Sequence, residues 1–252
     1  MSGLMNPAEF ANIAHAERGF WWYRGMREIL FRTLDPYLAP PVRLALEAGC
    51  GTGYLSRLLQ TERRWPVIAL DIAAEGLKYA RHLGVERAVQ GDARSLPFPS
   101  GCFDLVLSID VLAHLPPPHE QAAARELARV LKPGGLAAVR TSAFEFLGSR
   151  HSQFVSEKQR FTRRRLIDLF TAAGVRVLRC TYANSLLLPV AAVKFRVWEP
   201  LLRRPPASSL EALPRWLDRL LYRALAAEAA WLARGRNLPA GQSLILIGRR
   251  SG

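Results

Sequence analysis

The segment that most constrains the fold of this chain is residues 44–53, which read LALEAGCGTG. An apolar run gives way to Glu47, and glycines then occupy every second position from Gly49 to Gly53. Such a run is typical of a strand buried on both faces, and the apolar spacing in residues 54–60 predicts a helix after it. The order strand, glycine turn, helix is the beginning of an α/β sheet.

The glycines indicate that a ligand approaches the backbone at the carboxyl end of this strand. A dinucleotide fingerprint needs Gly-x-Gly-x-x-Gly, but Tyr54 holds the third glycine position, and no Gly-Lys-Ser/Thr of a phosphate loop follows. Asp71 ends the next predicted strand, residues 67–71, and lies 20 residues after Gly51. An acid at that distance contacts ribose hydroxyls in nucleotide-binding units; the alternative is an N-cap for the next helix.

Five further strands are predicted along the chain. Their ranges are 85–89, 103–110, 136–141, 175–181 and 242–248. A helix over residues 121–131 is closed by Lys-Pro-Gly-Gly, which should stop it and turn the chain.

Several of these segments resemble one family. Glu-x-Gly-x-Gly-x-Gly, the Gly-Asp-Ala of 91–93 and the Glu-Leu-x-Arg-Val-Leu-Lys-Pro-Gly-Gly of 126–135 are similar to motifs of class I S-adenosylmethionine (SAM)-dependent methyltransferases. Residues 20–25, Phe-Trp-Trp-Tyr-Arg-Gly, resemble a segment of a bacterial small-molecule subset, methyltransferase type 11.

The resemblance implies a Rossmann-like, doubly wound α/β sheet of seven strands with the last strand antiparallel. We expect an N-terminal helical cap (1–40), a SAM-binding core (41–182), a helical insertion (183–240) and the last core strand (241–252). About 60 residues between two strands are too many for a hairpin, so the insertion should have its own structure. An apolar stripe at 213–234 either caps the acceptor or packs on the core or a dimer partner.

The resemblance also implies a set of cofactor-binding residues. Asp92 would accept a hydrogen bond from the exocyclic amine of adenine; the alternative is that it closes an Asx-turn. Arg24 would form an ion pair with the methionyl carboxylate of SAM. The full set is Glu47, Gly49, Cys50, Gly51, Gly53, Asp71, Ile72, Asp92, Ala93, Ser108, Tyr23 and Arg24.

One segment of the sequence bears on the methyl acceptor. Residues 108–111 read Ser-Ile-Asp-Val and not the Asp/Asn-Pro-Pro-Tyr/Phe of adenine- and amide-methylating branches, which argues against nucleic acid. Candidate general bases are His114, His151 and Glu157; His114 has the alternative of a backbone-bonded histidine at a helix end. No metal is required.

We therefore expect an enzyme that transfers a methyl group from SAM, by in-line displacement, to a small, lipid-like or natural-product acceptor in an apolar pocket under the cap. Two alternatives stay open. One is a non-catalytic module that binds SAM or S-adenosylhomocysteine, and the other is an NAD(P)-dependent oxidoreductase.

The formal net charge of +14 fits a solvated basic surface, contact with an anionic membrane surface, or nucleic acid, and no groove-reading motif supports the last. Three widely separated cysteines indicate a reducing cytoplasm. Neither a signal peptide nor the ~20 apolar residues of a bilayer span is evident. Monomer and homodimer are both compatible with the sequence.

Overall fold

The computed structural model describes residues 6–38, 41–202, 205–208, 210 and 213–252. The ends of the predicted cap (1–5 and 39–40) lie outside the described residues. So do 203–204, 209 and 211–212 of the predicted insertion, which include the arginine pair Arg203-Arg204.

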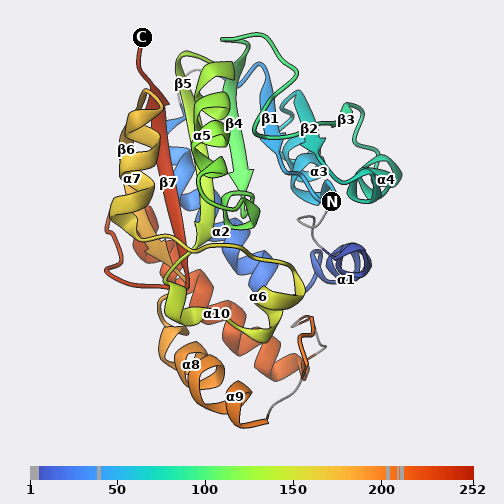
Figure 1. Ribbon diagram of the computed structural model, residues 1–252, viewed down its shortest axis with the longest axis vertical. Coiled ribbons are helices and arrows are strands. Elements are labelled where there is room, and N and C mark those ends of the chain that lie inside the picture. The colour runs from blue at the N-terminus through green and yellow to red at the C-terminus, as the bar shows by residue number, and fades with distance from the viewer. Residues whose placement is uncertain (1–5, 39–40, 203–204, 209, 211–212) are drawn as a thin grey trace.

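Seven strands form one sheet in the order β3-β2-β1-β4-β5-β7-β6 (Figure 1). They are β1 (Ala45–Ala48), β2 (Val67–Asp71), β3 (Ala88–Gln90), β4 (Phe103–Ile109), β5 (Leu131–Ser142), β6 (Val175–Ala183) and β7 (Ser243–Arg250). The first five run parallel, and β7 is antiparallel to both β5 and β6. The predicted fold class, including the antiparallel last strand, is confirmed.

Helices cover both faces of the sheet. One face packs against α2 (Trp21–Leu34), α3 (Tyr54–Thr61) and α10 (Arg215–Ala233), and the other against α5 (His119–Val130) and α7 (Arg163–Ala172). The alternation of β7 shows why: Leu244 and Leu246 join the second layer, whereas Ile245 and Ile247 join the first.

Two predicted boundaries were wrong. The third strand begins at Ala88 and not at Val85, because Val85 packs with Leu77 and Ala80 of α4 (Ala74–His82). Lys-Pro-Gly-Gly does not turn the chain between helix and strand. The helix ends at Val130, β5 already pairs with β4 at Leu131, and the four residues form an irregularity inside the strand.

The N-terminal helix α2 and the helix α10 of the insertion pack together. A Cβ on Gly25 would lie 2.4 Å from Leu225 Cδ1, so glycine permits this close approach. Asp218 accepts the backbone N–H of Trp21 at 3.0 Å and so caps α2 from α10. Segments from opposite ends of the chain therefore form one layer.

The described residues form eight further helical segments. They are α1 (Pro7–Ala16), η1 (Asp35–Tyr37), η2 (Leu112–His114), η3 (Glu145–Leu147), α6 (Arg150–Phe154), α8 (Leu188–Val193), the π-helical η4 (Lys194–Trp198) and α9 (Glu199–Leu202). In Figure 1, α8 and α9 form the lower end of the molecule, and α1 lies beneath α4. Among the described helices, none has the length and apolar character needed to cross a bilayer.

Candidate functional site

The glycine turn follows β1 at the carboxyl edge of the sheet. Gly49, Gly51 and Gly53 have φ angles of +81°, +55° and +77°, which side chains on L-residues disfavour. A Cβ on Gly53 would lie 2.5 Å from that of Ala80, whereas one on Gly51 would meet no atom within 4 Å. Gly53 thus serves close packing. Gly51 leaves open space in front of the backbone.

Asp71 joins this turn to the end of β2. Its Oδ2 accepts the Gly51 N–H at 2.7 Å, and its Oδ1 accepts the Ala73 N–H at 2.8 Å. Burial raises the pKa of this carboxyl, while these N–H groups and the charge of His114 lower it. Ile72 beside it is 44% exposed, an apolar surface fit for a base or ring. The acid predicted to bind ribose therefore lies at the open side of the turn.

Asp92 adopts the Asx-turn that the sequence offered as the alternative to adenine binding. Its Oδ1 accepts the backbone N–H of Arg94 at 2.8 Å, and the Arg94 guanidinium donates to both carboxylate oxygens. These bonds hold the pKa of Asp92 below its usual value. Ala93 is buried next to it. An adenine amine would have to share this carboxylate with Arg94.

The other predicted cofactor residues lie around β1 and β4. Ser56 donates to Glu47 Oε2 at 2.5 Å, and burial raises the pKa of Glu47 to about 8. Cys50 is buried in the turn, and burial raises its thiol pKa. Ser108 is fully buried, and its hydroxyl has no hydrogen-bond partner within the described part of the chain.

The N-terminal segment contacts the same turn. Thr52 donates a hydrogen bond to the Glu17 carboxylate, and Arg27 donates to the Glu17 carbonyl at 2.6 Å. Burial raises the pKa of Glu17 to about 7, although Thr52 and Arg27 oppose the shift. The Arg27 guanidinium also lies 5.0 Å from the centre of the Tyr54 ring, directly after the turn.

The aromatic segment 20–25 divides between two sides of α2. Trp22 lies 4.9 Å from the Arg140 guanidinium, which pairs with Asp110 after β4. Tyr23 packs edge-on against Trp22 at 5.1 Å. Burial raises the pKa of Tyr23, nearby Glu17, Glu9 and Asp110 add to the effect, and Arg140 opposes it.

Asp110 itself has φ of +61°, a strained conformation for a non-glycine residue. A strained backbone conformation persists only where neighbouring residues hold it, and such conformations are common at functional sites. Arg140 supplies those surroundings: it is 6% exposed and donates from Nε to both Asp110 oxygens at 3.2 Å. The pair fixes the chain at the end of β4, under Trp22.

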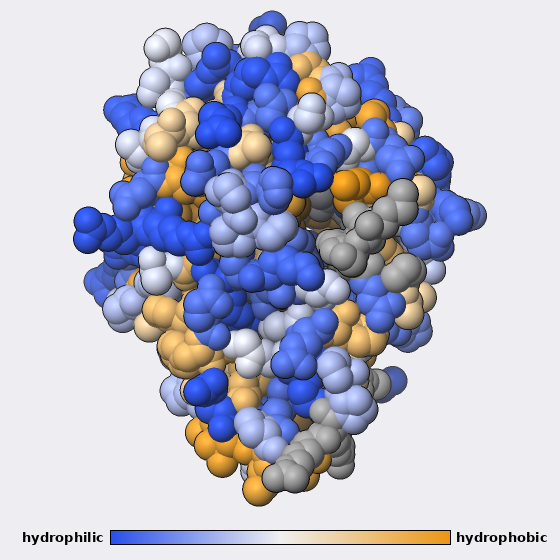
Figure 2. All heavy atoms as spheres, in the orientation of Figure 1, coloured by the Kyte–Doolittle hydropathy of each residue, from blue (hydrophilic) through white to orange (hydrophobic). Residues whose placement is uncertain are grey.

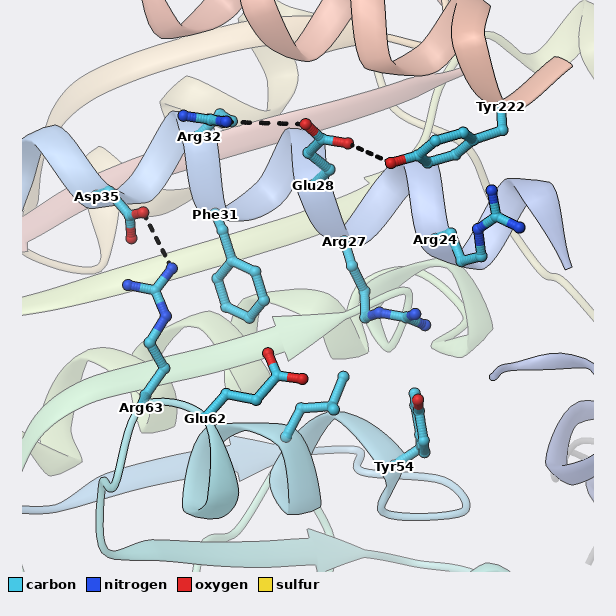
Figure 3. A pocket seen from close by; sticks show the side chains of 11 residues that line it. Arg24, Arg27, Glu28, Phe31, Arg32, Asp35, Tyr54, Glu62, Arg63 and Tyr222 are labelled. Atoms are coloured by element: carbon cyan, nitrogen blue, oxygen red, sulfur yellow. Dashed lines mark hydrogen bonds and ion pairs between the residues drawn. The ribbon is translucent and has the colours of Figure 1, made fainter. Parts of the chain in front are cut away.

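Arg24 lies on the other side of α2 and pairs with Asp218 at 3.4 Å, over the Tyr222 ring at 4.1 Å. It lines a cavity of about 420 Å³ between α2, α3 and α10 (Figure 3). Charged side chains line this cavity, including the Arg63–Asp35 pair at 3.0 Å. It therefore differs from the apolar acceptor pocket expected under the cap, and the predicted role of Arg24 requires release from Asp218.

Two of the three candidate bases have unpaired ring nitrogens. Nδ1 of His114, in η2, and Nδ1 of His151, in α6, are buried and have no hydrogen-bond partner among the described residues. His151 Nδ1 lies 3.9 Å from Oε1 of Glu9, a fully buried carboxylate of α1. Burial lowers the pKa of His151, Glu9 opposes this, and the charge of His114 adds to it.

Glu157 is engaged elsewhere. Arg160 donates to its carboxylate at 2.7 Å and 3.0 Å, and the same guanidinium donates to Ser152 Oγ at 2.8 Å. Arg160 thus connects Ser152 to Glu157. An ion pair of this geometry is a structural use of the carboxylate and competes with a role as base.

The sequence did not single out Glu9, Glu17, Arg27 or Arg140. Only Arg140 leaves a signal in the sequence, because a charge inside the apolar run of a buried strand needs a partner. The others reach the site through the packing of α1 and α2. Within the described residues, no group of three His, Cys, Asp or Glu side chains is placed to hold a metal ion.

Residues 46–139 match the family model described as "Methyltransferase domain". This match agrees with the resemblance of the motifs to class I methyltransferases, a family whose cofactor is SAM.

Two curated relatives align with more than half of the chain. The malonyl-[acyl-carrier protein] O-methyltransferase of Herminiimonas arsenicoxydans is 37% identical over 157 residues, 56% of this chain and 56% of that protein. The ubiquinone biosynthesis O-methyltransferase of Xanthomonas oryzae pv. oryzae is 34% identical over 148 residues. That alignment covers 53% of this chain and 60% of that protein. The chain therefore spans less than two thirds of either relative.

The fold extends beyond these alignments. The [4+2]-cyclase SpnF superposes with a TM-score of 0.60 at 19% identity, over 97% of this chain and 92% of that one. At this identity the likeness concerns the fold alone.

Proposed function

We propose that this protein transfers a methyl group from SAM to a small, lipid-like acceptor. The observation that carries the proposal is the turn at Gly51: open space in front of a glycine of positive φ, bordered by the Asp71 carboxylate. The match over residues 46–139 supports the class of reaction. The fold alone does not, since a cyclase shares it.

The cofactor would lie along the carboxyl edge of β1 and β2. Gly49, Gly51 and Gly53 shape the turn, Asp71 takes the ribose, and Asp92 with Ala93 takes adenine beside Ile72. Glu47, Cys50 and Ser108 form the buried floor behind the turn. When bound, SAM supplies a methyl group already activated on a sulfonium, so that the protein mainly has to orient the acceptor and exclude water.

The acceptor would lie between Tyr23, Trp22, His114 and His151, on the side of the turn covered by the N-terminal helices. His151 is our choice of general base, because burial lowers the pKa of its imidazole and Nδ1 has no hydrogen-bond partner among the described residues. Glu9, 3.9 Å away, would position the ring and stabilise its protonated form. An acceptor hydroxyl would give its proton to His151, and its oxygen would take the methyl group as the bond from the methyl carbon to the sulfonium sulfur breaks and S-adenosylhomocysteine leaves.

The acceptor class rests on the relatives and on the surface. One relative acts on malonyl-[acyl-carrier protein] and the other in ubiquinone biosynthesis. We propose a small-molecule substrate, a cytoplasmic location consistent with three free cysteines, and no nucleic-acid partner. In this proposal the predicted core and last strand would bind SAM, and the predicted N-terminal cap and insertion would enclose the acceptor.

Calorimetric titration with S-adenosylhomocysteine, NAD and NADP tests the cofactor. We expect S-adenosylhomocysteine alone to bind; binding of a dinucleotide alone would overturn the proposal. Incubation of the protein with radiolabelled SAM and fractionated lipid and polar extracts then tests the reaction. Label in a lipid fraction supports the proposal, whereas tight binding without transfer to any fraction would favour a non-catalytic module.

A further inference from the structure

The helices between β6 and β7 expose an unusual amount of apolar surface. Seven apolar side chains of residues 186–202 are between 45% and 78% exposed, and we call them the insertion surface: Leu186, Val190, Val193, Val197, Trp198, Leu201 and Leu202. In Figure 2, apolar residues gather at the lower end of the molecule, where Figure 1 places α8 and α9. Contiguous patches of this kind mark interaction sites.

The spacing of these residues places most of them on one helix face. Positions 190, 193, 197 and 201 are three or four apart, and α8, η4 and α9 are continuous from 188 to 202; Leu186 lies in the turn before α8. Ala191 is buried and Leu187 packs on the core. A surface helix normally turns its apolar stripe inward. Here a second apolar stripe faces outward.

Positive charge accompanies the apolar surface. Lys194 and Arg196 are exposed on the same helix, and three arginines spaced four apart are exposed along α10: Arg215, Arg219 and Arg223. The acids of these segments are turned toward the protein. Glu199 accepts the backbone N–H of Arg150 at 2.9 Å, and Asp218 caps α2.

The combination of exposed apolar side chains and positive charge indicates which kind of partner the surface binds. A symmetric contact with a second copy would bring basic residues of both copies together at the edge of an apolar patch. Nucleic acid would pair the charges and leave the valines and leucines exposed. An anionic bilayer accepts both, since apolar and Trp side chains enter the boundary of the acyl chains and cations meet lipid phosphates. We infer that the insertion surface docks on an anionic lipid bilayer.

The insertion surface also adjoins the candidate base. Arg150, which precedes His151, donates to Glu199 of α9, and the charge of Lys194 acts on the pKa of His151. Docking would thus place the acceptor side of the protein near the membrane. The inference of membrane binding is drawn from the exposed apolar and basic residues, and it does not depend on the proposed methyl transfer.

Flotation of the full chain with vesicles tests the inference. We expect binding to vesicles of phosphatidylcholine mixed with phosphatidylglycerol, weak binding to phosphatidylcholine alone, and loss of binding at high salt. Leu201→Asp should lower the partition coefficient about tenfold or more. Arg196→Gln should lower it about fivefold.

A matched pair of tryptophans provides the control. Trp198→Ser removes an insertion-surface residue, whereas Trp231→Ser removes an exposed tryptophan of α10 that is not part of the insertion surface. Only the first should weaken vesicle binding, with thermal unfolding and S-adenosylhomocysteine binding unchanged in both. Equal binding by all variants, or no preference for anionic vesicles, would overturn the inference. So would a dimer, seen by light scattering, that Leu201→Asp dissociates without any vesicle binding by the parent protein.

Discussion

Thr52, in the middle of the glycine turn, donates a hydrogen bond to the carboxylate of Glu17, which lies between α1 and α2. Both side chains are buried. The contact ties the N-terminal helices to the turn proposed to bind the cofactor. Occupancy of the site and the packing of these helices should therefore affect each other.

The first prediction concerns pH. Because burial raises the folded-state pKa of Glu17 to about 7, its contribution to stability is full below about pH 4.5 and is lost as the pH rises through about 7. Urea unfolding should show the free energy of unfolding falling over this range. Glu17→Gln should reduce the fall by up to about 3 kcal/mol. An unchanged pH dependence in the variant would contradict the assignment.

The second prediction concerns protons released on cofactor binding. With a pKa of about 8, Glu47 is largely protonated at neutral pH in the free protein. The ammonium and sulfonium of SAM favour its ionised form, so binding should release protons. Calorimetry in buffers of different ionisation enthalpy measures this release, which Glu47→Gln should diminish. Proton uptake on binding would be the opposite of what we expect.

The third prediction separates ligand space from backbone strain. Gly51→Ala and Gly134→Ala both place a side chain at positive φ with no atom within 4 Å, but Gly134 lies in the irregular part of β5. Each should lose about 1 kcal/mol of stability. Only Gly51→Ala should weaken S-adenosylhomocysteine binding strongly, as measured by calorimetry. Equal affinities of the two variants for S-adenosylhomocysteine would show that the ligand does not bind at the turn.

The fourth prediction compares two arginines of α2. Arg24 is paired with Asp218, whereas none of the ion pairs among the described residues includes Arg27, which lies against Tyr54. We expect Arg27 to bind the methionyl carboxylate. Arg27→Met should weaken S-adenosylhomocysteine binding roughly 10- to 100-fold, and Arg24→Met much less. The reverse ranking would restore the role that the sequence assigned to Arg24.

The fifth prediction concerns His151 and Glu9. Once an acceptor is known, His151→Gln should lower kcat/KM by about 10²- to 10⁴-fold. Glu9→Gln should lower it less and move the acidic limb of the pH–rate profile to lower pH, because the Glu9 carboxylate raises the pKa of His151. A Glu9→Gln profile with no shift would show that Glu9 serves only the packing of α1.

Local sequence signals were sufficient where the chain itself dictates structure. The glycines fix the turn because only they adopt its φ angles without strain, and the apolar runs fix the order of the core strands. The same signals misplaced the Lys-Pro-Gly-Gly segment. Its residues favour a turn, but pairing of Leu131 with Phe103 draws them into β5.

The sequence by itself thus determined the seven-stranded architecture and the glycine turn with Asp71 at its edge. Only the tertiary structure decided which side chains of the N-terminal segment approach that turn and the candidate base. Glu9 approaches His151, and Glu17 contacts Thr52, across 142 and 35 residues of chain. Such contacts depend on how amphipathic helices pack on the sheet, and no local pattern encodes that packing.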